Sequence, residues 1–214
     1  MATGFQLIRL WAALFMVIAM GSTFSASGQE TEALARRIGV IFEGSFEKAD
    51  ITTPITGARK TQLVAFYEWD FGVRQFTAIK WKDQGLDWDR LFAAARTGAD
   101  KILMKIKPEL VRDSRGVILY AIITDKDPFL TSVLLSPKLI DQFRETLGDR
   151  IHLVLLDRNR IYLFPATGGQ LADYGPALVE EFSSTPLPVS LEIFLIDDTG
   201  YRVIGELERI KAAE

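Results

Sequence analysis

Cysteine is absent from this 214-residue chain, and histidine occurs once, as His152. Without a thiol the protein can form no disulfide, no thiolate nucleophile and no cysteine-ligated metal centre. A single histidine excludes a cluster of imidazole ligands, so any histidine-dependent catalysis would rest on His152 alone. A strong charge of one sign is also lacking. The formal net charge is −3, so we predict no nucleic-acid partner, because such proteins carry a basic surface.

Long apolar runs are scarce as well, and the clearest one lies near the N-terminus, from Leu10 to Met20. Arg9 is the only charged residue before position 29, and small residues follow the run up to Gly28. A membrane-spanning helix needs roughly 20 apolar residues, about twice this length. The order of charge, short apolar run and small residues is typical of a secretory leader. We predict a signal peptide over 1–28, cleaved before Gln29, and a periplasmic or secreted protein without a membrane span after its removal.

The rest of the chain has no internal repeat, no charged tail and no linker rich in Pro and Ser. We predict a single domain over 29–214, with a looser N-terminal part over 29–58, because 44–57 is rich in Thr, Gly, Asp and Pro. Several apolar segments of strand length are joined by turns that suit only antiparallel neighbours. The predicted fold is therefore α+β: a mostly antiparallel sheet of hairpins with about three helices packed on it.

Apolar periodicity and capping residues define the expected elements. The expected strands, apolar in alternation or throughout, are 38–42, a hairpin over 61–82 with its turn at 70–72, and the segments 101–107, 117–123, 151–156, 161–164, 191–196 and 201–204. The expected helices are a short polar one over 30–37, one from the N-cap Asp87 to Gly98, one from Ser136-Pro137 to Gly148, and one after Gly175-Pro176.

A group of short motifs lies in the second half of the chain. Pro128-Phe129-Leu130-Thr131-Ser132 precedes an expected helix that ends at Gly148-Asp149, His152-Leu153-Val154 runs into Asp157-Arg158, and Pro186-Leu187-Pro188-Val189-Ser190 follows the last expected helix. On these points the stretch 127–194, about a third of the chain, resembles the C-terminal region of the YtpQ-like bacterial proteins, a family of unknown function. The resemblance supports the fold class and implies no catalytic residue.

The candidates for catalysis are His152, Asp157 and Arg158, which lie in one expected strand and the turn after it. A histidine base needs a nucleophile and an orienting carboxylate, and no Gly-x-Ser-x-Gly sequence supplies the first. We therefore expect His152 at a sheet edge or in the core. Neither a metal nor a cofactor is predicted, because pairs of carboxylates supply too few ligands for Ca²⁺. The acidic pairs are better explained as caps and turns: Asp87/Asp89, Asp125/Asp127 and Asp197/Asp198.

Aromatic residues are concentrated between positions 66 and 92, where eight occur. One interpretation is that they fill the core between the expected hairpin and the following helix. The other is that Trp69, Phe71 or Trp81 remains exposed near the turn and contacts a partner or a sugar. The sequence leaves both interpretations open.

Taken as a whole, the sequence favours an exported bacterial protein that is a non-enzymatic interaction or assembly module with a protein partner in the cell envelope. The alternative is a hydrolase of an envelope polymer or sugar that uses scattered carboxylates, assisted by His152 or Arg158. A cleft with two acids of shifted pKa would favour the hydrolase, and an exposed aromatic patch would favour the binding module. The oligomeric state stays open.

Overall fold

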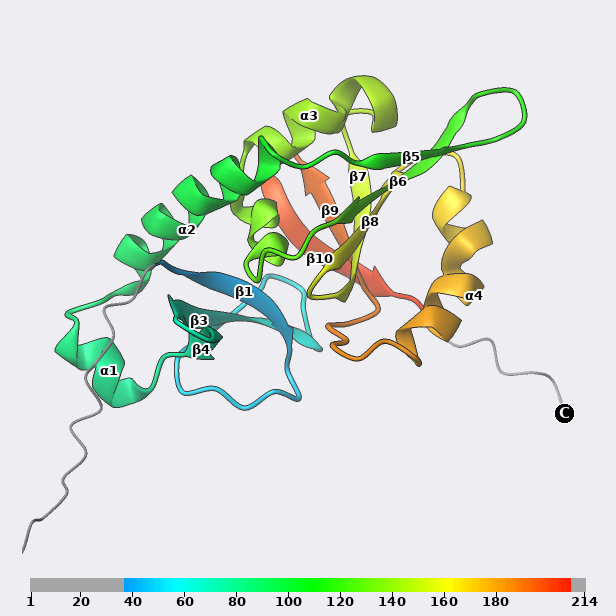
Figure 1. Cartoon of the computed structure of the whole chain (residues 1–214). Coiled ribbons are helices and arrows are strands. Elements are labelled where there is room, and N and C mark those ends of the chain that lie inside the picture. Colours follow the sequence, from blue (N-terminus) through cyan, green and yellow to red (C-terminus); the bar gives the residue numbers. More distant parts are fainter. Residues whose placement is uncertain (1–36, 209–214) are drawn as a thin grey trace, which may run out of the picture. The chain divides into compact units, whose positions relative to one another are not determined.

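Two antiparallel sheets organise residues 37–208, the part of the chain that the computed structural model describes (Figure 1). The smaller sheet has the order β1–β3–β2, with β4 also paired to β3. The larger sheet has the order β10–β9–β7–β8–β6–β5. The strands are β1 (Ile38–Gly44), β2 (Thr52–Pro54), β3 (Thr61–Trp69), β4 (Gly72–Gln75), β5 (Glu109–Arg112), β6 (Ile118–Thr124), β7 (Ile151–Asp157), β8 (Arg160–Pro165), β9 (Glu192–Asp197) and β10 (Gly200–Glu206). The predicted α+β class is confirmed.

Four α-helices and one 3₁₀ helix accompany the two sheets in residues 37–208. They are α1 (Ala78–Asp83), α2 (Trp88–Leu103), the 3₁₀ helix η1 (Leu130–Leu135), α3 (Lys138–Leu147) and α4 (Gln170–Phe182). Helix α2 packs on η1 and β1, and α3 contacts β6 and β8. Helix α4 contacts β7 and β8 and lies apart from the others (Figure 1). In residues 37–208 no helix is both long and apolar enough to cross a membrane. The predicted signal peptide and all of the expected helix over 30–37 except Arg37, which is not helical, lie outside the described residues.

The main core lies between the two sheets, where Phe42 of β1 packs edge-on against Phe194 of β9 and Tyr201 of β10, with ring centroids 5.9 and 5.4 Å apart. A second, smaller cluster lies under α4 and includes Val154 and Phe164. Successive residues of a strand point to opposite faces. The central strand β7 is therefore apolar along most of its length because it serves both clusters.

Polar contacts close the seam between the sheets. The buried carboxylate of Glu192 accepts hydrogen bonds through Oε1 from the backbone N–H groups of Arg59 and Lys60, at 2.6 and 3.0 Å. The hydroxyls of Thr61 and Ser190 lie 2.7 Å apart and are both buried. These bonds join the start of β3 to the start of β9. The seam is thus specific as well as apolar, because Oε1 of Glu192 and the hydroxyls of Thr61 and Ser190 each have a defined partner.

The aromatic segment departs from the predicted hairpin in its second arm. The turn and the first arm are as predicted, but β4 ends at Gln75 and the chain turns into α1, where the Thr77 side chain accepts from the Lys80 N–H. The segment after Gln75 is predicted as a strand because Ile79 and Trp81, two positions apart, would lie on one strand face and Phe76 on the other. Local capping by Thr77 decides in favour of the helix.

Two further predictions were wrong in the same region. Helix α2 does not end at Gly98 but continues to Leu103, so the expected strand over 101–107 does not form. Alternating Ile and Lys residues mimic a strand there, yet Met104, which would share a strand face with buried Ile102, is 74% exposed. Ala95, Ala99 and Ile102 are all buried, at the spacing of one helix face. A glycine inside a helix costs only about 1 kcal/mol, and tertiary packing overrides it.

In the second half the predicted elements form, with one shift. Helix α4 begins at Gln170, after Gly169 in the left-handed region at φ 78°, and encloses Pro176 instead of starting after it. The expected single sheet is two sheets, because β1–β4 pair only among themselves. Strands β2 and β5, helix α1 and η1 were not predicted. The first three are short, and η1 is apolar throughout and gives no helical periodicity.

Candidate functional site

A two-residue turn at Asp70-Phe71 joins β3 to β4, with Trp69 paired to Gly72 across the ladder. Gly72 has φ 124°, a conformation that favours glycine because it has no Cβ. Tight two-residue turns hold both strands in one register. The tip of this hairpin is therefore a well-defined position from which side chains project.

The ring of Phe71 is 83% exposed and packs edge-on against Trp69, with centroids 4.8 Å apart. Trp69 is half-buried, and the guanidinium carbon of Arg74 lies 3.5 Å from the centroid of its indole ring. A cation over an indole is attracted by the ring quadrupole. Arg74, which the sequence analysis missed, thus restrains Trp69, and Trp69 in turn supports the exposed ring. We call these three residues the aromatic tip.

Trp81 lies in a different environment. It is half-buried between Phe76 and Trp88, with centroid distances of 5.7 and 5.6 Å. The series continues to Tyr67 at one end and Phe92 at the other. The eight aromatic residues therefore divide between the two interpretations of the sequence. Those from Phe76 onward pack against one another beside the core, whereas the ring of Phe71 in the aromatic tip is exposed to solvent.

His152 lies in the middle of the larger sheet, paired with Phe164 and Leu195. Burial lowers the pKa of its imidazole, and the nearby charge of Arg150 lowers it further. Asp157 is five residues along the same strand, about 16 Å away at the rise of a β-strand. The structure therefore does not bring His152 together with Asp157 and Arg158.

Asp157 and Arg158 hold the fold at the β7–β8 turn. The carboxylate of Asp157 is buried and accepts from the Thr185 hydroxyl at 2.9 Å and from the Asn159 N–H at 2.7 Å. Arg158 donates through Nη2 to Oε2 of Glu43 at 2.9 Å, and its Nε lies 2.6 Å from Oε1. Glu43 is 1% exposed. This ion pair links β1 of the smaller sheet to the larger one.

Glu43 is the acid that sequence reasoning missed. Burial raises the pKa of its carboxyl, although the Arg158 guanidinium opposes the shift. Its place in β1, flanked by apolar residues, is the only signal in the sequence for a buried acid. Glu43 is not among the lining residues of four cavities in residues 37–208, and the raised pKa of its carboxyl arises from burial between the sheets.

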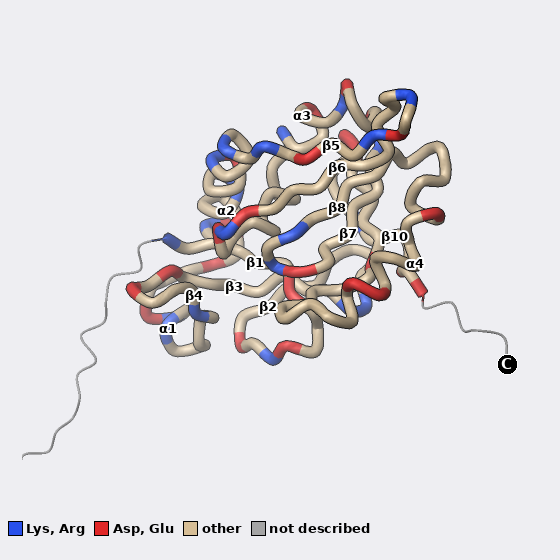
Figure 2. Tube along the Cα trace, turned by 45° about the vertical axis from the view of Figure 1, so that its right-hand side comes forward, with Lys and Arg blue, Asp and Glu red and all other residues tan. Residues whose placement is uncertain are grey.

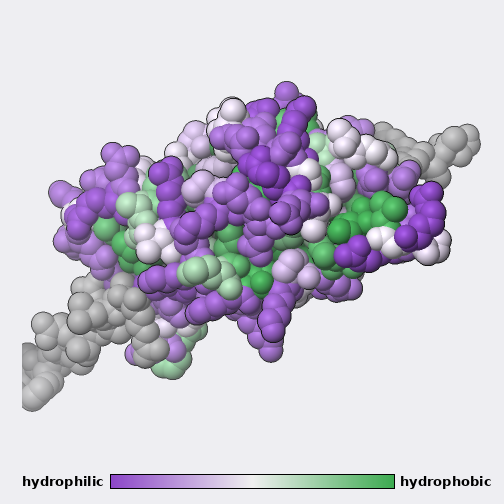
Figure 3. Space-filling model, turned by 90° about the horizontal axis from the view of Figure 1, so that it is seen from above, coloured by the Kyte–Doolittle hydropathy of each residue, from purple (hydrophilic) through white to green (hydrophobic). Residues whose placement is uncertain are grey.

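One member of each acidic pair acts as a local cap. Asp87 accepts from the Arg90 N–H at the start of α2, Asp125 accepts from the Asp127 N–H, and Asp197 accepts from the Thr199 N–H. In residues 37–208 no group of three or more His, Asp or Glu side chains is placed to hold a metal ion. Basic and acidic positions are interspersed over the fold in Figure 2, and apolar areas in Figure 3 are separated by hydrophilic ones.

Comparisons with known proteins add no relative. No family model matches the chain, and no curated protein or solved structure matches it either. The resemblance to the YtpQ-like family therefore stays a prediction.

Proposed function

We propose that this protein is an exported, non-enzymatic binding module of a bacterial cell envelope, which contacts a protein partner through the aromatic tip. The exposure of Phe71 on a restrained support carries the proposal. Aromatic and arginine side chains contribute a large share of binding energy at protein interfaces, and Trp69, Phe71 and Arg74 combine both types. A rigid support lowers the entropy cost of binding, because little ordering is left to occur on contact.

The hydrolase alternative has less support. Its candidate residues lie at opposite ends of β7, and Asp157 and Arg158 are committed to bonds that hold the turn and the sheet seam. Among the carboxyls of residues 37–208, the one whose pKa is raised, Glu43, lies in that seam.

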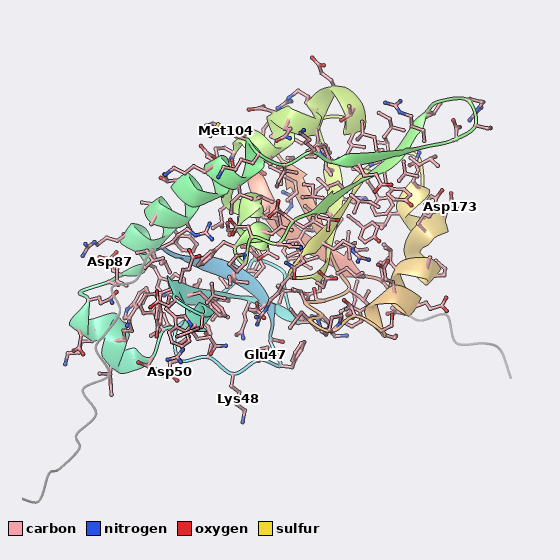
Figure 4. All side chains as sticks on the ribbon, viewed as in Figure 1. Glu47, Lys48, Asp50, Asp87, Met104 and Asp173 are labelled. Atoms are coloured by element: carbon pink, nitrogen blue, oxygen red, sulfur yellow. The ribbon has the colours of Figure 1, made fainter. Side chains whose placement is uncertain are left out.

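The test is capture of the partner from the native envelope. Three tagged full-length proteins are compared: wild type, Phe71→Ala and Met104→Ala. Each is cross-linked in its host and purified, and the proteins that co-purify are quantified by mass spectrometry. Met104 is the matched control, since it is apolar and 74% exposed and lies at the far end of α2 (Figure 4). We expect one partner at near-equal stoichiometry with wild type and Met104→Ala, reduced about tenfold or more with Phe71→Ala, the effect of a binding hot spot.

Two results would overturn the proposal. One is recovery of the exported wild-type protein alone. The other is a partner that Phe71→Ala retains as well as Met104→Ala does. Export is tested separately: the protein from the periplasmic or secreted fraction should have an N-terminus at Gln29, and full-length protein found only in the cytoplasm would contradict it.

A further inference from the structure

The outer edge of β4 carries unpaired backbone groups. In an antiparallel ladder the N–H and C=O groups of successive residues point to opposite sides of the strand. The N–H of Glu68 in β3 donates to the carbonyl of Arg37, on the side away from β4. Glu68 is paired with Val73 and Phe66 with Gln75, so Val73 and Gln75 must direct their own N–H and C=O groups outward. Within residues 37–208 these groups have no hydrogen-bond partner.

A cavity of about 470 Å³ lies at the end of this edge. Its walls are the loop residues Lys48, Ala49 and Asp50 and the segment 74–77. The carboxylate of Asp50 already accepts the Ala78 N–H at 3.1 Å. The two basic side chains of the cavity are Lys48 and Arg74, and Figure 4 shows Lys48 pointing away from the sheet. The cavity therefore continues the edge of β4, and its lining carries the two cations Lys48 and Arg74 against the single carboxylate of Asp50, which is bonded to the Ala78 N–H.

The far edge of the larger sheet differs. At β10 the N–H of Val203 donates to the carbonyl of Thr56, so the loop that precedes β3 closes part of that edge. Proteins cover or close the edges of their sheets because an open edge readily pairs with another chain. Within residues 37–208 nothing pairs with the edge of β4, which lies directly beside the aromatic tip.

We propose that the edge of β4 binds an extended segment of the protein partner, which adds to the smaller sheet as a strand. The segment pairs through its backbone with Val73 and Gln75, as in other cases of strand addition. An acidic residue of the segment lies between Lys48 and Arg74, and an apolar residue further along packs on Phe71. This inference rests on the proposed function and adds to it the conformation and chemistry of the partner.

The decisive pair of variants is Gln75→Pro and Gln75→Ala. Proline removes the outward N–H but no hydrogen bond of the fold, and it is tolerated in edge strands at such positions. Alanine keeps the N–H and removes the side chain. The probe is a phage-displayed library of random seven-residue peptides, selected on the immobilised full-length protein. We expect enriched peptides that contain Asp or Glu next to apolar residues in alternation.

A synthetic peptide from the enriched pool should bind wild type and Gln75→Ala with similar Kd. Gln75→Pro should weaken binding about tenfold, the effect of one lost hydrogen bond near 1.4 kcal/mol. Circular dichroism and the unfolding midpoint establish that each variant folds. Should Gln75→Pro fail to fold, the peptide is N-methylated at alternate amides, which removes the N–H groups that donate to the outward carbonyls of Val73 and Gln75. Methylation of one alternate set should weaken binding more than methylation of the other set.

The absence of enriched peptides overturns the inference, as does binding that neither Gln75→Pro nor N-methylation changes. The proposed function is judged by a different result. If the intact partner is captured in a manner that depends on Phe71 but is unchanged by Gln75→Pro, the aromatic tip binds the partner and strand addition is wrong. If capture depends on neither residue, both proposals are wrong.

Discussion

The β3–β4 and β7–β8 hairpins have turns of the same length but of different use. At the β7–β8 turn Arg158 is paired with buried Glu43, and the Asn159 side-chain amide donates to the carbonyl of Asp125. At the β3–β4 turn the Phe71 ring is directed to solvent and contacts only its own hairpin neighbour Trp69 among described aromatic residues. The first turn fastens two sheets together. The second is supported by its own strands, so its outer surface remains available to another molecule.

The largest expected effect on stability is at the β7–β8 turn. Arg158→Met would leave the Glu43 carboxylate buried without its partner, which typically costs about 3–5 kcal/mol. The free energy of unfolding, from denaturant titration at pH 7, measures this loss. Arg74→Met at the other turn is the control and should cost less, since a cation over an exposed ring contributes about 0.5–1 kcal/mol. Equal losses at the two turns would contradict the comparison.

Trp81→Ala should destabilise the fold by about 2–3 kcal/mol, toward the lower end for a large-to-small change because Trp81 is half-buried. The lost contacts are those with Phe76 and Trp88. Partner capture by the fraction that remains folded should be unchanged. A variant of wild-type stability that no longer captures the partner would place Trp81 in the interface instead.

Stability measured over a range of pH tests the role of Glu43, which pairs with Arg158 at the β7–β8 turn. Burial raises the pKa of Glu43 in the folded state, so folding favours the protonated form. The resulting stabilisation is complete below the ordinary Glu pKa of 4.5 and is lost as the pH rises through the raised value. Relative to Glu43→Gln, the wild type should therefore lose stability as the pH rises above that ordinary value, by at most about 1.4 kcal/mol per pH unit. A stability difference that is constant between pH 4 and 8 would refute this role.

The smallest change in stability is expected at Phe71. Phe71→Ala should alter the free energy of unfolding by no more than about 0.5 kcal/mol, as is usual for an exposed position. The same variant should lose the partner, so its effects on folding and binding are opposite to those of Trp81→Ala. Loss of stability comparable to that of Trp81→Ala would show that the ring supports the fold.

The sequence predicted the larger sheet well because its strands are apolar and its turns are short. Ile151 to Leu156 and the turn that follows are unambiguous for that reason. It predicted 76–107 poorly, since short apolar groups there fit both periods, and the burial of Ile102 beside exposed Met104, which distinguishes the helix from a strand, is set by tertiary packing. Local patterns cannot show which distant element covers a face.

The same limit applies to the candidate site. The sequence named Trp69, Phe71 and Trp81 as residues of which one could remain exposed, but it could not distinguish Phe71, whose ring is 83% exposed, from the two half-buried tryptophans. The contact of Arg74 with Trp69 requires the register of β4, and the pairing of Glu43 with Arg158 joins residues 115 positions apart. Neither contact has a signature in a single sequence.

The seam between the sheets has a consequence for the order of folding. Glu192 binds the amide of a residue 133 positions earlier, and Ser190 meets a hydroxyl 129 positions earlier. Contacts between such distant positions form late, because a long loop must close first. During synthesis, the smaller sheet can form early, but its contacts with Ser190 and Glu192 cannot form until the C-terminal strands have emerged. For a chain exported as proposed, this delay would keep the polypeptide loosely folded, and therefore able to pass through a membrane channel, until its last strands are complete.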